Sequence, residues 1–172
     1  MGALEVGDIA PDFVLAGMQI VDGQVEHREF RLSERHGAPV VLAFYPLDSS
    51  KVCTEQLCSY QDEFGGFDAL GAQVWGISLQ GLESHEEFAR QQGLTFPLLA
   101  DHRDGVAASY GTMLGPNAIR RSVFIIDGDG IVRWKHVALV GFTFRKAAEI
   151  RDQILRLFPE PVGGTFALAP PV

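Results

Sequence analysis

At its centre the chain reads VVLAFYPLDSSKVCTEQLC, residues 40–58, and this stretch contains both of its cysteines, Cys53 and Cys58. The apolar residues at its start predict a buried strand, which Pro46 ends because proline has no N–H to give to a sheet. A polar loop follows, and a helix-like pattern begins at or near Cys53. Because the N-terminus of a helix stabilises negative charge, a cysteine placed there can be held as a reactive thiolate.

Strand and helix patterns alternate on both sides of this stretch. The first half of the chain is expected to contain a hairpin of strands over 13–15 and 24–30, a helical turn over 32–37, a helix from Cys53 to about Leu70 and a strand over 72–79. The second half is expected to contain a helix capped by Ser84 that runs to about Gln92, an edge or irregular strand over 96–100 and a short helix capped by Asp104. A hairpin over 122–126 and 131–137 and a last helix capped by Thr143 complete the expected elements. A β-α-β unit followed by a hairpin and a closing helix predicts a mixed sheet covered by helices. We therefore expect an α/β, thioredoxin-like fold with an added N-terminal β-hairpin, a single domain over 1–158 and a Pro/Gly-rich tail over 159–172.

Composition narrows the function classes. The net charge of −8 disfavours nucleic acid and acidic membrane surfaces as partners. No apolar run approaches the ~20 residues that span a bilayer, and no basic, apolar leader opens the chain. The C-x4-C spacing differs from the C-x2-C of zinc ribbons and thioredoxin-type redox sites. The five histidines include no i,i+4 pair, so we expect no metal site.

Several motifs together point to one family. The central one is Pro46-x3-Ser50-x2-Cys53, and three further matching segments lie at 6–13, at 83–85 with 93–101, and at 121–127. In these motifs the chain resembles a peroxiredoxin, most closely the bacterioferritin-comigratory or Q-type branch, over roughly residues 5–158. The resemblance implies reduction of hydrogen peroxide and organic hydroperoxides without a metal or other cofactor, and recycling by thioredoxin or a similar dithiol protein. It also implies that Cys53 is the peroxidatic cysteine and that Cys58 is the resolving one.

The residues around Cys53 suit this chemistry. A free cysteine has a pKa of about 8.5 and is mostly protonated at neutral pH, so a cation must favour the thiolate. Arg121 is the expected cation, because strand alternation turns the neighbouring Arg120 to the opposite face. Ser50 is expected to cap the helix, to donate a hydrogen bond to the peroxide, or both.

The other expected site residues shape the loop around the sulfur. Pro46 is expected to shield it from water, and Tyr45, Phe44 and Val52 are expected to form the substrate pocket. One departure concerns the arginine's partner: related sequences often have Glu three residues after the peroxidatic cysteine, whereas this chain has Gln56.

The spacing of the two cysteines predicts a conformational change. Residues five apart on an intact α-helix have Cα atoms roughly 8–9 Å apart, whereas a disulfide needs about 4.4–6.8 Å. We therefore expect the helix to unwind over about 50–60 when Cys53 and Cys58 join.

Other readings remain open. Cys58 is alternatively a buried core residue in a one-cysteine peroxidase that an external thiol resolves. The chain is alternatively a non-catalytic redox sensor of thioredoxin fold, or an oxidoreductase acting on protein disulfides, although the absence of C-x2-C argues against the last. We expect a cytoplasmic protein that is a monomer, with a weak homodimer as the alternative.

Overall fold

The central stretch forms the strand and the helix that its pattern predicts. In the computed structural model, which describes residues 3–102, 104–139 and 144–159, strand β3 covers Val40–Phe44 and helix α1 covers Lys51–Asp62. Every side chain of β3 is buried, as expected for a strand with both faces covered. Helix α1 begins two residues earlier than expected, which puts Cys53 inside its first turn.

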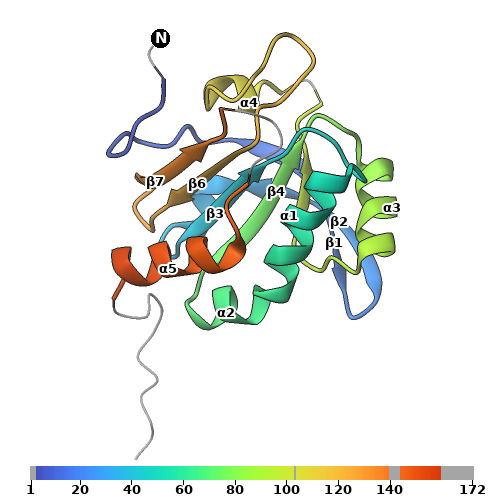
Figure 1. The fold of residues 1–172 in the computed structure, drawn as a ribbon, viewed down its shortest axis with the longest axis horizontal. Helices are drawn as coiled ribbons and strands as arrows, with labels where there is room; N and C mark the ends of the chain where they lie inside the picture. The colour runs from blue at the N-terminus through green and yellow to red at the C-terminus, as the bar shows by residue number, and fades with distance from the viewer. Residues whose placement is uncertain (1–2, 103, 140–143, 160–172) are drawn as a thin grey trace, which may run out of the picture.

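A seven-stranded mixed sheet forms the centre of the molecule (Figure 1). Its strands, in spatial order, are β2 (Gln24–Arg31), β1 (Val14–Val21), β5 (Leu98–Ala100), β4 (Gln73–Ser78), β3, β6 (Ser122–Ile126) and β7 (Val132–Val137). Strands β3, β4 and β5 run parallel and the other pairs are antiparallel. The expected N-terminal hairpin is present, and its two-residue turn has positive φ at Asp22 (49°) and Gly23 (78°), as a type I′ turn requires.

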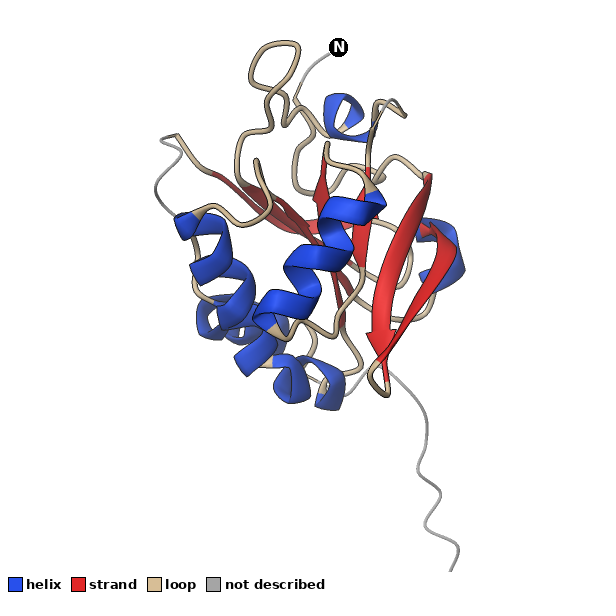
Figure 2. Ribbon diagram, turned by 90° about the vertical axis from the view of Figure 1, so that its right-hand side faces the viewer, coloured by secondary structure: helices blue, strands red, loops and turns tan. Residues whose placement is uncertain are grey.

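Helices pack against one face of the sheet. Figure 1 shows α1, α2 (Phe64–Ala69) and α5 (Ala147–Leu157) in front of it, and Figure 2 views the side on which α3 (Leu82–Gln92) and the β1–β2 hairpin lie. One core cluster lies beneath these helices and includes Cys53, Leu57 and Phe88. A second cluster on the other face is covered by the N-terminal segment and by α4 (Val106–Ser109).

The expected long helix after Cys53 is two helices. The chain leaves the first at Glu63 and begins α2 at Phe64, so Gly65 and Gly66 lie within α2 and do not form the break. The strand expected over 96–100 is not at an edge: β5 lies between β1 and β4. Pro97 lies just before the strand, so no hydrogen bond of the sheet requires the N–H group that proline lacks.

Two helix caps expected from the sequence are wrong. Helix α3 begins at Leu82 with Gly81 as its cap, because the Ser84 hydroxyl donates to Asp48. Helix α4 begins after Gly105, and its first N–H groups donate to the carboxylate of Asp101, not to Asp104.

Some predictions fall outside the described residues. Thr143 and residues 160–172 lie there, so the predicted cap and the tail stay predictions. Helix α5 itself begins at Ala147, after Lys146. Among the described residues, no helix has both the length and the apolar character needed to cross a membrane.

Candidate active site

Strand order and register bring three distant segments to one edge of the sheet. Because β3 and β4 are parallel, the loops that leave them, residues 45–50 and 79–81, emerge side by side. Strand β6 runs antiparallel to β3 and pairs Ser122 with Phe44. Arg121, which immediately precedes β6, therefore lies at the edge where β3 ends and the loop to α1 begins.

Cys53 and Arg121 meet at this edge. An Nη2 hydrogen of Arg121 donates to Sγ of Cys53 at 3.2 Å, and the two residues are 3% and 0% exposed. A full positive charge thus contacts the sulfur at a place where water screens it little. Arg120 is partly exposed, so the arginine that faces the cysteine is the one strand alternation indicates.

Gln56 holds the guanidinium from its other side. Its Oε1 accepts a hydrogen bond from Nη1 of Arg121, and its Nε2 donates to the Tyr60 hydroxyl at 2.9 Å. Gln56 is fully buried, whereas Glu55 is exposed. A neutral amide, that of Gln56, therefore helps to position the guanidinium of Arg121.

Ser50 is the N-cap of α1. Its Oγ accepts the N–H of Cys53 at 3.4 Å, and its carbonyl accepts the N–H of Thr54 at 2.8 Å. Pro46, Ser50 and Val52 are each partly buried, so the loop around the sulfur is shielded without being sealed.

The two aromatic residues at the end of β3 have different surroundings. Phe44 is fully buried and packs on Tyr110 and Phe124, in the cluster on the other face of the sheet from Cys53. This placement does not support the pocket role that the sequence predicted for Phe44. Tyr45 lies in the same cluster as Cys53 but has no exposed surface, so it lies beneath the loop and does not line a pocket mouth.

Cys58 lies five residues, about 1.4 turns, further along α1 and faces α3. It is partly buried, and its thiol contacts Oε1 of Gln92 at 3.8 Å. Burial, with the negative charge of Asp62, raises the pKa of the Cys58 thiol. Both cysteines are free thiols, and the helix between them is unbroken.

Sequence reasoning missed a buried polar cluster beside this site. Asp48 and His85 are 6% and 0% exposed, and Oδ2 of Asp48 lies 2.7 Å from Nδ1 of His85. Both residues lie inside segments that match the family, at 46–53 and 83–85, but the sequence did not indicate that α3 brings His85 to the loop from 37 residues away. The available signal was the combination of a charged residue inside the active-site loop and a histidine in an otherwise apolar helix position.

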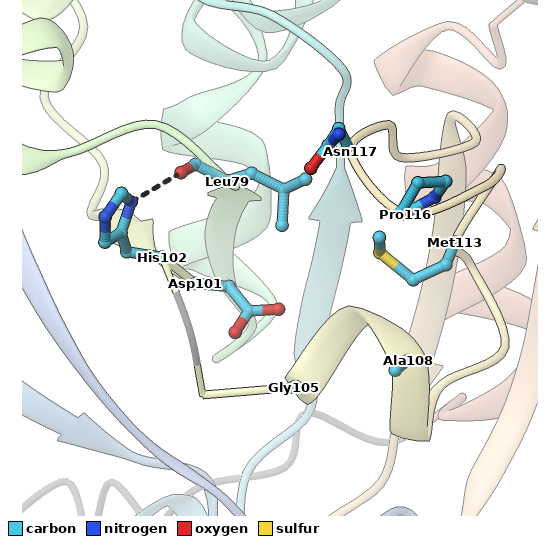
Figure 3. Close-up of a pocket in the computed structure, with 8 residues that line it drawn as sticks. All are labelled: Leu79, Asp101, His102, Gly105, Ala108, Met113, Pro116 and Asn117. Atoms are coloured by element: carbon cyan, nitrogen blue, oxygen red, sulfur yellow. Dashed lines mark hydrogen bonds between the residues drawn. The ribbon is translucent and has the colours of Figure 1, made fainter.

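A cavity of about 350 Å³ opens at the same edge of the sheet (Figure 3). Its walls come from Leu79, Asp101, His102, Gly105, Ala108, Met113, Pro116 and Asn117. None of the predicted site residues lines it, and the carboxylate of Asp101 is occupied by the N–H groups of Val106 and Ala107. In the part of the chain that the structure describes, no three His, Cys, Asp or Glu side chains are grouped as metal ligands.

Known proteins share the sequence and the fold. The model of the AhpC/TSA family matches residues 6–135, which is most of the chain. The chain belongs to the AhpC/TSA family. Among curated relatives, chloroplastic peroxiredoxin Q of Oryza sativa subsp. japonica is 36% identical over 140 residues, covering 77% of this chain and 59% of the rice protein. A Coxiella burnetii protein named as a peroxiredoxin bcp is 31% identical over 148 residues, covering 81% of this chain and 93% of that protein. The Q-type resemblance seen in the motifs is confirmed, and this family member spans about three fifths of its rice relative.

Solved structures agree with the fold. Mycobacterium bovis AhpC superimposes with a TM-score of 0.81 at 21% identity, covering 91% of this chain and 94% of that chain. The reduced 2-Cys peroxiredoxin of Plasmodium vivax gives 0.80 at 23% identity, covering 90% of this chain and 84% of that chain. At these identities the likeness concerns the fold alone, and it confirms the predicted thioredoxin-like α/β architecture of the family member.

Proposed function

We propose that this family member is a thiol-dependent peroxidase in which Cys53 attacks a hydroperoxide. The observation that carries the proposal is the hydrogen bond from Arg121 to the buried sulfur of Cys53, at the first turn of α1. Guanidinium and helix N-terminus both favour the thiolate, which is the nucleophilic form of cysteine. The peroxiredoxin names of its relatives support the same reaction class.

In the proposed first step the Cys53 sulfur attacks one oxygen of the hydroperoxide. An S–O bond forms as the O–O bond breaks, and the leaving oxygen departs as water or an alcohol after taking a proton. Negative charge develops on both oxygens, and donors aimed at them lower the barrier. Arg121 is one such donor, and the Ser50 hydroxyl, which accepts from Cys53 N–H, still has its own hydrogen to give.

The loop supplies the surroundings for this step. Pro46 has no N–H to donate, and its partly buried ring, with the partly buried side chain of Val52, keeps bulk water from the sulfur. We propose that the hydroperoxide reaches Cys53 between Pro46, Ser50 and Val52. Among the expected site residues of this segment, these three are partly exposed, whereas Phe44, Tyr45 and Cys53 are buried.

In the proposed second step the sulfenic acid on Cys53 condenses with the Cys58 thiol and releases water. The unbroken helix keeps residues five apart roughly 8–9 Å from each other at their Cα atoms, too far for a disulfide. The first turns of α1 must therefore unwind. Unwinding also takes Cys58 away from the burial and from the Asp62 charge that raise its pKa, so its thiol ionises more readily. Thioredoxin or a similar dithiol would then reduce the disulfide.

A one-cysteine mechanism is the second candidate. It is favoured by the position of Cys58, which contacts Gln92 on α3 and is partly buried. In that mechanism an external thiol reduces the sulfenic acid and Cys58 stays in place.

The proposal also includes the substrates and the setting of the enzyme. We propose that it reduces hydrogen peroxide and organic hydroperoxides, and that it is a monomer in the reducing environment of the cytoplasm.

Stopped-flow consumption of hydrogen peroxide by the reduced protein tests the proposal. We expect a second-order rate constant far above that of free cysteine, abolished in Cys53→Ser and retained in Cys58→Ser. In repeated turnover with thioredoxin, Cys58→Ser should lose activity, whereas unchanged turnover would favour the one-cysteine mechanism. A wild-type rate no faster than free cysteine would instead favour the redox-sensor reading.

A further inference from the structure

A cluster of buried polar side chains under the active-site loop has no part in the proposed chemistry. It consists of Tyr45, Asp48, Ser84 and His85, and we name it the loop anchor. Asp48 is 6% exposed, and Tyr45 and His85 are 0% exposed. Burying a charge costs free energy unless the charge is fully paired. We therefore expect this cluster to have a specific role that apolar side chains at the same positions could not fill.

The carboxylate of Asp48 is fully engaged. Tyr45 donates its hydroxyl hydrogen to Oδ1 at 2.6 Å, and Ser84 donates to Oδ2 at 2.7 Å. Nδ1 of His85 lies 2.7 Å from the same Oδ2. Burial opposes ionisation of Asp48, but the hydrogen bond and charge of His85, with the bonds from Tyr45 and Ser84, lower the pKa of this carboxyl.

Both ring nitrogens of His85 face oxygen atoms. Its Nε2 lies 3.0 Å from the carbonyl oxygen of Leu99, and a carbonyl oxygen only accepts, so Nε2 carries a hydrogen. Its Nδ1 faces the Asp48 carboxylate, which also only accepts when ionised. A hydrogen bond between the ring and the ionised carboxylate is charge-assisted and of the stronger kind.

The loop anchor ties the segment before α1 to two other elements. Through Ser84 and His85 it reaches α3, and the N–H of Asp48 donates to Oε1 of Gln80 in the β4–α3 loop. The residue after Asp48, Ser49, has φ of 62°, a left-handed conformation that non-glycine residues adopt only when their surroundings hold them. The loop that presents Ser50 and the first turn of α1 is thus held from below against a local strain.

We propose that Asp48 is a positioning residue for the Cys53 reaction. Paired with His85, its carboxylate holds residues 45–50 and the first turn of α1 in the arrangement that reacts with hydroperoxide, and so opposes the unwinding that joins the two cysteines. The second half of this statement rests on the proposed function. Loss of the carboxylate charge should consequently slow attack on the peroxide and speed formation of the disulfide.

Asp48→Asn tests the proposal, because it keeps the size of the side chain and removes its charge. We expect the rate constant for peroxide to fall by about tenfold and the rate constant for disulfide formation to rise several-fold, by loss of a charged hydrogen bond. As a consequence, excess peroxide should leave less sulfinic acid on Cys53 than in wild type. An unchanged peroxide rate, or a fall in both rates together, would overturn the proposal, since general destabilisation has no reason to speed the second step.

Asp127→Asn is the matched control. Asp127 is also buried, accepts several hydrogen bonds and pairs with Arg133. Burial raises the pKa of this carboxyl, but the hydrogen bonds and the charge of Arg133 outweigh burial and lower it. It lies in the β6–β7 turn, at the opposite end of β6 from Arg121. We expect both rate constants of this variant to match wild type, and losses equal to those of Asp48→Asn would count against a specific role for Asp48.

Amide hydrogen exchange of the reduced protein separates this proposal from the proposed function. We expect residues 50–58 to exchange about tenfold faster in Asp48→Asn than in wild type, whatever either protein does with peroxide. If Asp48→Asn does not fold, Ser84→Ala removes one hydrogen bond without changing a charge, and we expect a smaller acceleration in the same residues. Unchanged exchange over 50–58 would overturn the loop anchor, whereas a wild type that forms no disulfide would overturn only the role of Cys58.

Discussion

Arg121→Met removes the positive charge beside Cys53 and keeps a long, unbranched side chain in its place. Two opposite unit charges 3.2 Å apart attract by about 5 kcal/mol at an effective dielectric constant of 20, and desolvation of the buried guanidinium offsets much of this. The net contribution of a hydrogen bond to a charged group is about 1.5–3 kcal/mol. Since about 1.4 kcal/mol is a factor of ten, we expect the peroxide rate constant to fall by about 10- to 150-fold.

The assay follows thiolate absorbance at 240 nm against pH and the stopped-flow rate with hydrogen peroxide, on protein whose fold is checked by thermal unfolding. Arg120→Met is the control, since it removes the same charge from the adjacent residue, and its rate should stay close to wild type. Arg121→Lys should lie between, because an ammonium keeps the charge but cannot bridge Cys53 and Gln56 as a planar guanidinium does. A folded Arg121→Met protein with the wild-type rate, or an equal loss in Arg120→Met, would refute the reasoning.

Three further predictions follow from the same geometry. Gln56→Glu keeps an acceptor for Arg121 but adds a negative charge near Cys53, so the rate constant for hydrogen peroxide should fall several-fold, and an unchanged rate constant would contradict this. Burial and the charge of Asp62 raise the pKa of Cys58 only while α1 is folded, so the folded helix holds the thiol proton more tightly than the unwound helix does. This proton therefore stabilises the folded helix fully below the pKa of a free cysteine, about 8.5, and the stabilisation is lost as the pH rises above that value. Disulfide formation should therefore accelerate above that pH in rapid-quench experiments, and a flat profile there would argue against it. Ser49→Val should lower the free energy of unfolding in urea by about 1–2 kcal/mol because of its left-handed backbone, whereas Ser49→Gly should not lower it, and equal effects would rule out strain.

Local patterns were sufficient for most of the fold and for the pair at its active site. The apolar run ending at Pro46 predicts β3, and the Asp22-Gly23 dipeptide predicts the first hairpin, since both depend on residues adjacent in sequence. Arg121 is preferred to Arg120 because alternation along a strand turns adjacent residues to opposite faces and because Arg121 lies in the segment that matches the family's arginine strand.

Features that depend on distant partners could not be predicted in this way. Ser84 has the sequence of a helix cap, yet its hydroxyl donates to Asp48, 36 residues earlier. Pro97 suggested an edge strand, although the strand begins one residue later and lies inside the sheet. The pairing of Asp48 with His85 follows from the parallel register of β3 and β4 and from the packing of α3, neither of which leaves a local signature.

The reactivity of Cys53 is tested most directly by mass analysis after one equivalent of hydrogen peroxide, with peptide mapping of wild type and Cys58→Ser. Wild type should lose two hydrogens and give a peptide that joins Cys53 to Cys58, and Cys58→Ser should gain one oxygen on Cys53. An unmodified Cys53 thiol, or oxygen found first on another residue, would contradict the account.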